Sequence, residues 1–286
     1  MKRVLFMLIM IVSLSFLITI SSGEAKDSNS VVEKIKIDNM FNVDKVTGES
    51  EIFKKSITND TPKEKKEKIT EVPVLNYHFF YNDETICNED ICLNIDKFKE
   101  QLDYLKKEGY KTLTIDEFKK WMYGEIELYD KSVLITIDDG AFGTSKINGN
   151  YLIPILEEYK MHATLFLITA WWDKENYQSD YLDIESHGYD IHRVGICGFK
   201  NIECLNHEEL KDDFSKSITL VDNNIAFAYP FYDYTEDSIS VLQELDFKIA
   251  FVGGNKKATR SDNKYLIPRY PIYDSTKIED FINMVK

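Results

Sequence analysis

The chain has 286 residues, a formal net charge of −14 and 29% charged residues. This acidic balance argues against a nucleic-acid partner, because proteins that bind nucleic acids concentrate Lys and Arg to displace counterions from phosphates. With 17 Phe and 17 Tyr residues the chain can build a sizeable core, and the part able to fold suits one α/β domain of barrel size.

The first 23 residues have the layout of a secretory signal. Lys2 and Arg3 precede an apolar run from Val4 to Ile20, and small residues follow. The pattern predicts export, and the length of the run leaves open whether the segment is cleaved or stays as a membrane anchor. Residues 24–70 are polar and charged and cannot bury enough apolar surface to fold alone, which predicts a flexible linker before a domain over residues 71–286.

The four cysteines form two closely spaced pairs in the exported domain. Cys87 with Cys92, and Cys197 with Cys204, each bracket a polar loop. Because an exported compartment permits oxidation, we predict two local disulfides. The alternative is a cysteine-rich metal site, which would favour tighter Cys-x-x-Cys spacing.

Short apolar runs typical of buried strands alternate along the domain with segments whose apolar residues recur at helical spacing. In chain order the predicted strands cover residues 72–78, 111–113, 132–139, 163–168, 182–186, 225–229 and 248–252. The predicted helices cover residues 95–108, 115–122, 152–159, 207–221, 235–245 and 276–284. About seven alternating units predict a parallel sheet that closes into a distorted (β/α)7 TIM-like barrel.

Capping residues mark several helix ends. Asn94 and Asn206 are predicted N-caps, and Thr114 with Glu117 has the spacing of a capping box. Gly109 is placed to end the first helix, since glycine readily adopts the left-handed conformation found there.

Two adjacent carboxylates end the apolar strand that begins at Ser132. Asp138 and Asp139 are followed by Gly140, at a strand end, where α/β folds keep their chemistry. Neighbouring side chains there point to different sides, so one carboxylate can bind a cation while the other faces a substrate or a water. The alternative interpretation is an Asp-Gly turn without chemistry.

Two of the five histidines, His187 and His192, stand five residues apart. On a regular helix or strand their imidazoles would diverge, so they converge only if the chain curls between them, which Gly188 makes easy. Two His and one Asp would supply the three protein ligands of an open zinc site. Two unrelated histidines are the alternative.

Four blocks in this order resemble the polysaccharide deacetylase family, also called carbohydrate esterase family four or the NodB homology domain. They are Tyr77-His78, Thr136–Gly140, Ser186–His192 and Phe227–Phe231. The spacing of the two histidines in the third block is similar to the spacing found in the branch that deacetylates poly-N-acetylglucosamine and related wall polymers. The resemblance covers residues 71–286 and implies a metal-dependent hydrolase that removes N-acetyl groups from N-acetylhexosamine polymers, with Zn²⁺ as the expected ion.

Carried over by position, the resemblance implies a role for each motif residue. The implied metal ligands are Asp139, His187 and His192. Asp138 would be the general base, and a backbone N–H near Phe231, which follows Tyr229 and Pro230, would stabilise the oxyanion.

Four aromatic residues are candidates for stacking on sugar rings, although such residues also serve in packing. They are Trp171, Trp172, Tyr189 and Tyr232. The chain departs from the family at two places: Gly188 replaces the usual Ser or Thr, and Tyr232 stands where many relatives have Gly. We expect the first change to be mild and the second to narrow or reshape the groove.

The late histidine usual in the family is absent, since none follows His207. We predict that His78 is the general acid, because it follows the first strand on the same rim as Asp138 and an imidazole titrates near neutrality. The resemblance points to the same residue, and a histidine that is hydrogen-bonded at a strand exit is the alternative. Arg269, at a late strand end, either orients Asp138 or forms a surface ion pair.

Two other functions stay open at this point: a catalytically weak glycan-binding protein of the cell wall, and an O-acetyl glycan esterase. We expect a monomer that is secreted or held at the outer face of the cytoplasmic membrane, associated with the cell wall, with the N-terminal segment as a candidate tether.

Overall fold

The computed structural model describes residues 67–82, 90–141, 143–144 and 150–286. The predicted signal segment, the linker up to residue 66 and Cys87 lie outside these ranges. Within them no helix has the length and apolarity that a membrane crossing requires.

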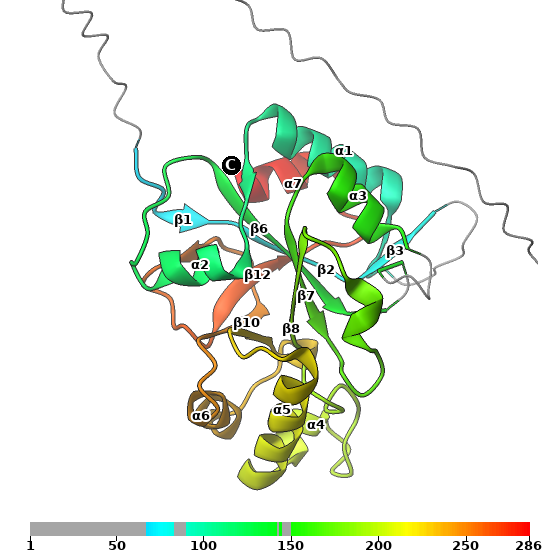
Figure 1. Cartoon of the computed structure of the whole chain (residues 1–286), viewed down its shortest axis with the longest axis vertical. Coiled ribbons are helices and arrows are strands. Elements are labelled where there is room, and N and C mark those ends of the chain that lie inside the picture. The colour runs from blue at the N-terminus through cyan, green and yellow to red at the C-terminus, as the bar shows by residue number, and fades with distance from the viewer. Residues whose placement is uncertain (1–66, 83–89, 142, 145–149) are drawn as a thin grey trace, which may run out of the picture. The chain divides into compact units, whose positions relative to one another are not determined.

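Seven parallel strands close into a barrel (Figure 1), as predicted, although the predicted strand at residues 111–113 is not one of the seven. Around the barrel the strands are β2 (Val74–Tyr77), β12 (Ile267–Pro271), β10 (Ile249–Gly253), β9 (Ala226–Ala228), β8 (Leu182–Ser186), β7 (Ala163–Leu167) and β6 (Ser132–Asp139). Closure comes from β2, which pairs with β12 on one side and with β6 on the other. The short β5 (Lys111–Thr112) adds to β6.

Helices surround the barrel. They are α1 (Ile95–Lys107), α2 (Ile115–Met122), α3 (Leu152–Tyr159), α4 (Asn201–Cys204), α5 (His207–Val221), α6 (Glu236–Glu244) and α7 (Ile278–Val285), with 3₁₀ turns η1 (Lys174–Tyr177) and η2 (Pro230–Tyr232). Figure 1 shows α1, α3 and α7 together on one side and α5 with α6 on the opposite side.

Two small sheets lie outside the barrel. The antiparallel pair joins β1 (Glu71–Val72) to β11 (Ala258–Thr259), and the parallel pair joins β3 (Phe79–Tyr81) to β4 (Cys92–Asn94). The sequence analysis missed β3, β4 and β11, because strands of two or three residues are too short to show an apolar periodicity. Its strand ranges also left out β12, of which it noted only Arg269 at a strand end.

The core follows the period of two along each strand. Alternate residues such as Leu134, Phe166 and Phe251 belong to one buried cluster. The intervening residues, for example Ile135, pack with α1, α3 and α7 in a second cluster. Asp138 has the same parity as Leu134 and therefore continues the first row, whereas Asp139 follows the second row to the rim.

Capping is as predicted. The Asn94 side chain accepts from the N–H of Asp96, and the capping box of Thr114 with Glu117 is formed. Asn206 forms a second capping box with Glu209. These bonds satisfy N–H groups that a helix start would leave unpaired, which fixes where each of these helices begins.

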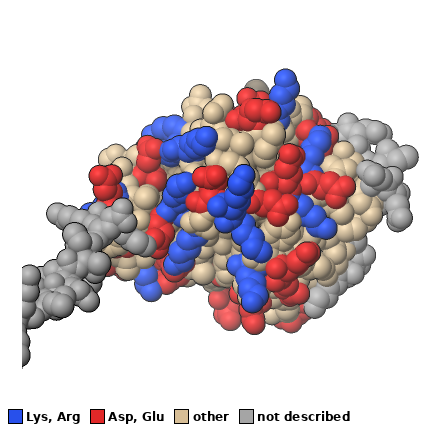
Figure 2. All heavy atoms as spheres, turned by 90° about the horizontal axis from the view of Figure 1, so that it is seen from above, with Lys and Arg blue, Asp and Glu red and all other residues tan. Residues whose placement is uncertain are grey.

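The surface carries both signs of charge. On the face that Figure 2 shows, Lys and Arg side chains lie among Asp and Glu side chains. Exposed pairs such as Lys216 with Asp212 and Lys248 with Asp246, each 2.5 Å apart, belong to this mixed surface charge. Such pairs contribute about 0–1 kcal/mol each, so the fold depends on its core rather than on them.

Candidate active site

The predicted site residues meet where the barrel strands end. Asp138 and Asp139 close β6, His187 directly follows β8, and Arg269 lies on β12. Because all seven barrel strands are parallel, their carboxyl ends form one rim. The topology alone therefore gathers side chains that are more than 100 residues apart in the chain, as for Asp138 and Arg269.

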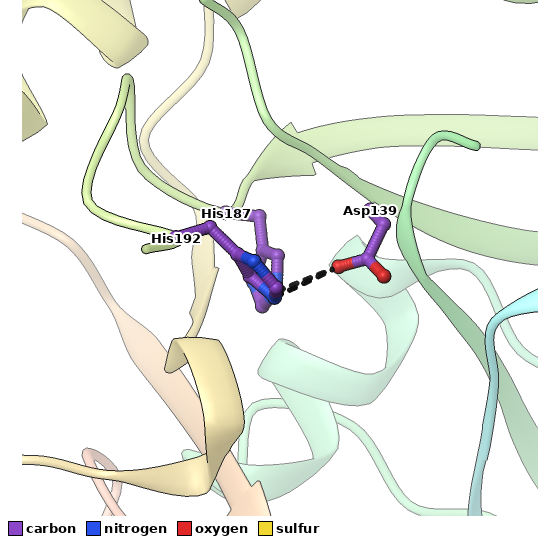
Figure 3. A group of neighbouring side chains, drawn as sticks. All are labelled: Asp139, His187 and His192. Carbon is purple, nitrogen blue, oxygen red and sulfur yellow. Dashed lines mark ion pairs between the residues drawn. The ribbon is translucent and has the colours of Figure 1, made fainter. Parts of the chain in front are cut away.

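Three side chains on this rim form a compact group (Figure 3). Oδ1 of Asp139 lies 3.3 Å from Nε2 of His187 and 3.2 Å from Nε2 of His192. The three candidate ligand atoms lie within 4.8 Å of one another. Asp139 has a φ of 76°, a left-handed conformation that Asp tolerates better than most residues and that belongs to the strand end.

The donor set fits a divalent metal. Nδ1 of His187 lies 2.8 Å from the carbonyl of Ala228, so this nitrogen carries the proton and the lone pair of Nε2 faces Asp139. Among the described residues Oδ1 of Asp139 is buried and has no hydrogen-bond donor. A buried carboxylate oxygen opposite two imidazole lone pairs is the environment that a cation completes.

Charges at the site are unevenly distributed. Burial, with a smaller contribution from the neighbouring His187, lowers the pKa of His192 to about 4 and keeps this imidazole neutral, the form that binds metals. Burial by itself lowers the pKa of His187, but Asp138 and Asp139 outweigh it and raise that pKa overall. The two carboxylates thus favour positive charge at His187, whereas His192 stays neutral.

Asp138 is held by Arg269. The guanidinium makes two parallel bonds of 2.7 Å to the two carboxylate oxygens. Arg269 is 0% exposed and Asp138 2% exposed, which places the pair inside the barrel and not on the surface. Burial by itself raises the pKa of Asp138, but Arg269 and His187 hold it below its ordinary value. Asp138 thus stays an acceptor with a fixed orientation.

His78 belongs to the same electrostatic environment. Burial lowers its pKa, Asp138 and Asp139 act in the opposite direction, and Arg269 and His187 lower it further. Its Nδ1 is buried and has no hydrogen-bond partner among the described residues. The other two histidines lie elsewhere, because His162 precedes β7 and pairs with Asp183, and exposed His207 pairs with Glu244.

Comparison with known proteins is consistent with this geometry. The model of the family "Polysaccharide deacetylase" matches residues 126–250, a range that holds Asp138, Asp139, His187 and His192. The chain contains a polysaccharide deacetylase domain. The poly-beta-1,6-N-acetyl-D-glucosamine N-deacetylase of Staphylococcus aureus is similar to it, with 26% identity over 76% of this chain and 83% of that protein.

Solved structures share the fold of this deacetylase domain. The Streptococcus pyogenes deacetylase PplD has a TM-score of 0.63 and 20% identity, and the alignment covers 76% of this chain and 98% of PplD. IcaB from Ammonifex degensii has a TM-score of 0.62 at 20% identity, covering 76% and 97% of the two chains.

Aromatic side chains border the group of Asp139, His187 and His192. Phe231 is 40% exposed, and its ring centroid lies 4.2 Å from that of His192. Trp171 is 45% exposed, lies 5.8 Å from the His192 ring, and donates from Nε1 to Asp190. Trp171 and Trp172 also line a hollow of about 360 Å³. Tyr189 is half-buried beneath Lys216.

The segment implied to carry the oxyanion donor is a tight turn. Tyr229 and Pro230 are buried, so their side chains support the turn and do not reach a substrate. Phe231 and Tyr232 both have positive φ values, 58° and 65°. Glycine would adopt these angles freely, so the turn is strained at Tyr232, and its fixed shape depends on neighbouring contacts.

Tyr232 covers the buried ion pair. Its ring centroid lies 5.6 Å from the guanidinium carbon of Arg269, and its hydroxyl donates to Asn76. A Cβ atom at Gly253 would lie 2.7 Å from the Tyr232 ring, so the ring has space only because residue 253 is glycine. Tyr232 therefore belongs to the wall around Arg269.

One of the two predicted disulfides is present, since Cys197 and Cys204 are bonded. The bond closes the loop that follows His192 and ends at α4. The pairing of Cys87 with Cys92 stays a prediction, because Cys87 lies outside the described residues.

The sequence analysis missed one buried acid near the site. Asp213 on α5 is 8% exposed and accepts from the N–H groups of Tyr189 and Asp190. Its position on the helix face of Leu210, Phe214 and Ser217 was the available signal, since an acid on a buried face needs a partner.

Proposed function

We propose that the chain is an exported, metal-dependent polysaccharide N-deacetylase that acts on N-acetylhexosamine polymers of the poly-N-acetylglucosamine or peptidoglycan type. The observation that carries the proposal is the group of Asp139, His187 and His192 beside the Arg269-bound Asp138, within a deacetylase domain. The name of the Staphylococcus aureus relative favours a poly-N-acetylglucosamine substrate.

In the proposed reaction each group has one task. A divalent ion, Zn²⁺ in this proposal, held by Asp139, His187 and His192, would polarise the acetyl carbonyl and acidify a water. Asp138 accepts the proton of the attacking water, and Arg269 orients Asp138. A backbone N–H near Phe231 stabilises the negative oxygen of the tetrahedral intermediate.

His78 completes the proposed reaction by protonating the leaving amine. Amide hydrolysis needs this step, because an amine cannot leave as its anion. The buried Nδ1 of His78 without a hydrogen-bond partner, and the coupling of His78 to both aspartates, support its place at the site.

The proposal includes the export of the domain. Residues 1–23 would direct the chain out of the cytoplasm as a cleaved signal or a membrane anchor, and residues 24–70 would link them to the domain over residues 71–286. A secreted or surface-held monomer in the cell wall would then meet its polymer substrate outside the membrane.

The acetate released from two substrates distinguishes the three candidate functions. The purified protein is incubated with N-acetylglucosamine oligomers and, separately, with an O-acetylated glycan. Acetate from the oligomers alone supports the N-deacetylase. Acetate from the O-acetylated glycan alone would identify an esterase, and glycan binding without acetate from either substrate would identify a binding protein.

The metal site has its own test. The double variant His187→Ala, His192→Ala is expected to lose the stoichiometric ion, because one carboxylate remains of three ligands. Metal content per chain, measured by elemental analysis after dialysis, checks this. The matched control is His162→Ala with His207→Ala, which changes two histidines away from the site and should keep the metal. Full metal and full activity in the first variant would show that the site is misassigned.

A comparison of two substrates tests the role of His78. His78→Gln is expected to lose about 10²–10⁴-fold in kcat on an N-acetylated oligomer, since the amine must be protonated. On an activated acetyl ester the loss should be much smaller, because that leaving group departs as an anion. Acetate release from both substrates is the measurement, and wild-type rates on both would exclude His78 as the general acid.

A further inference from the structure

The turn between the two histidine ligands is held on both sides of its backbone. We call residues 188–190 the ligand turn. On one side the carbonyls of Gly188 and Tyr189 accept from the N–H groups of Thr169 and Ala170, at 3.2 and 2.9 Å. These bonds come from backbone that follows β7, so they do not depend on any side chain.

On the other side a single carboxylate serves two N–H groups. Oδ1 of Asp213 accepts from Tyr189 at 2.7 Å, and Oδ2 accepts from Asp190 at 2.8 Å. Asp213 is 8% exposed. Burial raises its pKa to about 6, while the two backbone bonds act against that rise, so the carboxylate is mostly ionised at neutral pH. Bonds to an ionised acceptor are shorter and stronger than neutral ones.

The face of α5 that carries Asp213 also reaches Gly188, the first residue of the ligand turn. One helical turn after Asp213, the hydroxyl of Ser217 lies 2.7 Å from that of Ser186, and Ser186 accepts from the N–H of Gly188 at 3.1 Å. The buried face of α5 thus fixes three consecutive N–H groups, those of residues 188, 189 and 190. A helix face without polar groups could not do so.

Space around the turn is tight. Gly188 has a φ of +82°, and a Cβ atom there would lie 2.7 Å from Ile191 and 3.1 Å from Oδ1 of Asp213. The left-handed residue makes the chain curl, and the carboxylate packs directly against the curl. Contacts with α5 therefore act directly on the backbone that leads to His192.

From these contacts we infer that Asp213 is a positioning residue of the metal site. It acts through the peptide groups of Tyr189 and Asp190 and keeps His192 in register with His187 and Asp139. The inference rests on the proposed function, which makes the two histidines metal ligands. Without the carboxylate the turn loses two charge-assisted bonds, the imidazoles sample divergent directions, and metal binding must restore their register.

Metal affinity of the full chain tests this inference without any activity assay. The dissociation constant for Zn²⁺ is measured by competition with a chelator, and the absorption spectrum of the Co²⁺-substituted protein reports the ligand geometry. Asp213→Ala is expected to bind Zn²⁺ roughly 10–100-fold more weakly, the usual effect of losing a group that orients ligands. The Zn²⁺ affinity of Asp213→Asn should lie between those of the wild type and Asp213→Ala, because its amide oxygen still accepts one N–H.

The control is Asp212→Ala, one residue earlier on α5. The Asp212 side chain is 65% exposed and pairs with Lys216, so its loss should leave affinity and spectrum unchanged. A role in stability alone would lower the melting temperature of the Asp213 variants and leave the Zn²⁺ affinity of the folded protein intact, which would overturn the inference. If Asp213→Ala fails to fold, the nearly isosteric Asp213→Asn decides in the same way. Wild-type protein that binds no Zn²⁺ would instead refute the proposed metal site, and the inference with it.

Discussion

Asp138→Asn is expected to lose about 10²–10⁴-fold in kcat while the metal stays bound, because it removes the proposed proton acceptor and leaves the three proposed metal ligands untouched. The amide keeps the shape of the carboxylate, and its oxygen can still accept from Arg269. It cannot take a proton from water. Acetate release and metal content, measured on the same preparation, check both halves of this expectation.

Two controls make the result specific. Asp183→Asn is the same chemical change at the opposite end of the barrel, where Asp183 accepts from Ile115 and lies 2.9 Å from His162. This variant should keep normal turnover. Melting curves accompany both variants, since Asp138→Asn leaves the buried charge of Arg269 without its counter-ion. Normal turnover in Asp138→Asn would exclude Asp138 as the general base, and loss of metal would make it a ligand.

The fold could be predicted because local signals and global topology agree. The apolar strand that ends in Asp138 and Asp139, the capping box of Thr114 and Glu117, and the alternation of strand and helix each act over a few residues. Their sum leaves few arrangements other than a parallel barrel. The two outer sheets escaped prediction because their strands are short and their pairing depends on the finished barrel.

The site could be predicted only in part. The sequence places Asp139 and His187 at strand ends and His192 five residues after His187, and the barrel topology with the turn at Gly188 then brings the three together. Nothing local shows that Asp213 reaches back to the turn between the histidines, or that Tyr232 covers Arg269. These contacts join residues from different elements, so they follow from packing and not from spacing along the chain.

Arg269→Met is expected to lower the free energy of unfolding by about 3–5 kcal/mol, because it leaves the Asp138 carboxylate buried without its partner. The guanidinium supplies two bonds to Asp138 and one of 3.2 Å to Thr136. It also lies between the faces of Phe166, Tyr232 and Phe251, at 5.6, 5.6 and 5.9 Å. Methionine can pack against these rings but cannot neutralise the acid. Denaturant unfolding measures the loss.

A double variant shows whether the cause is the unpaired charge. Asp138→Asn with Arg269→Met removes both charges, so it should be more stable than either single variant, since no buried ion then lacks a partner. If packing of the arginine stem were the cause, the double variant would be as unstable as Arg269→Met or worse. Arg269→Lys should be intermediate, because an ammonium keeps the charge but cannot bind both oxygens in the same planar geometry. Unfolding of Arg269→Met at the wild-type denaturant concentration would contradict a structural role for the pair.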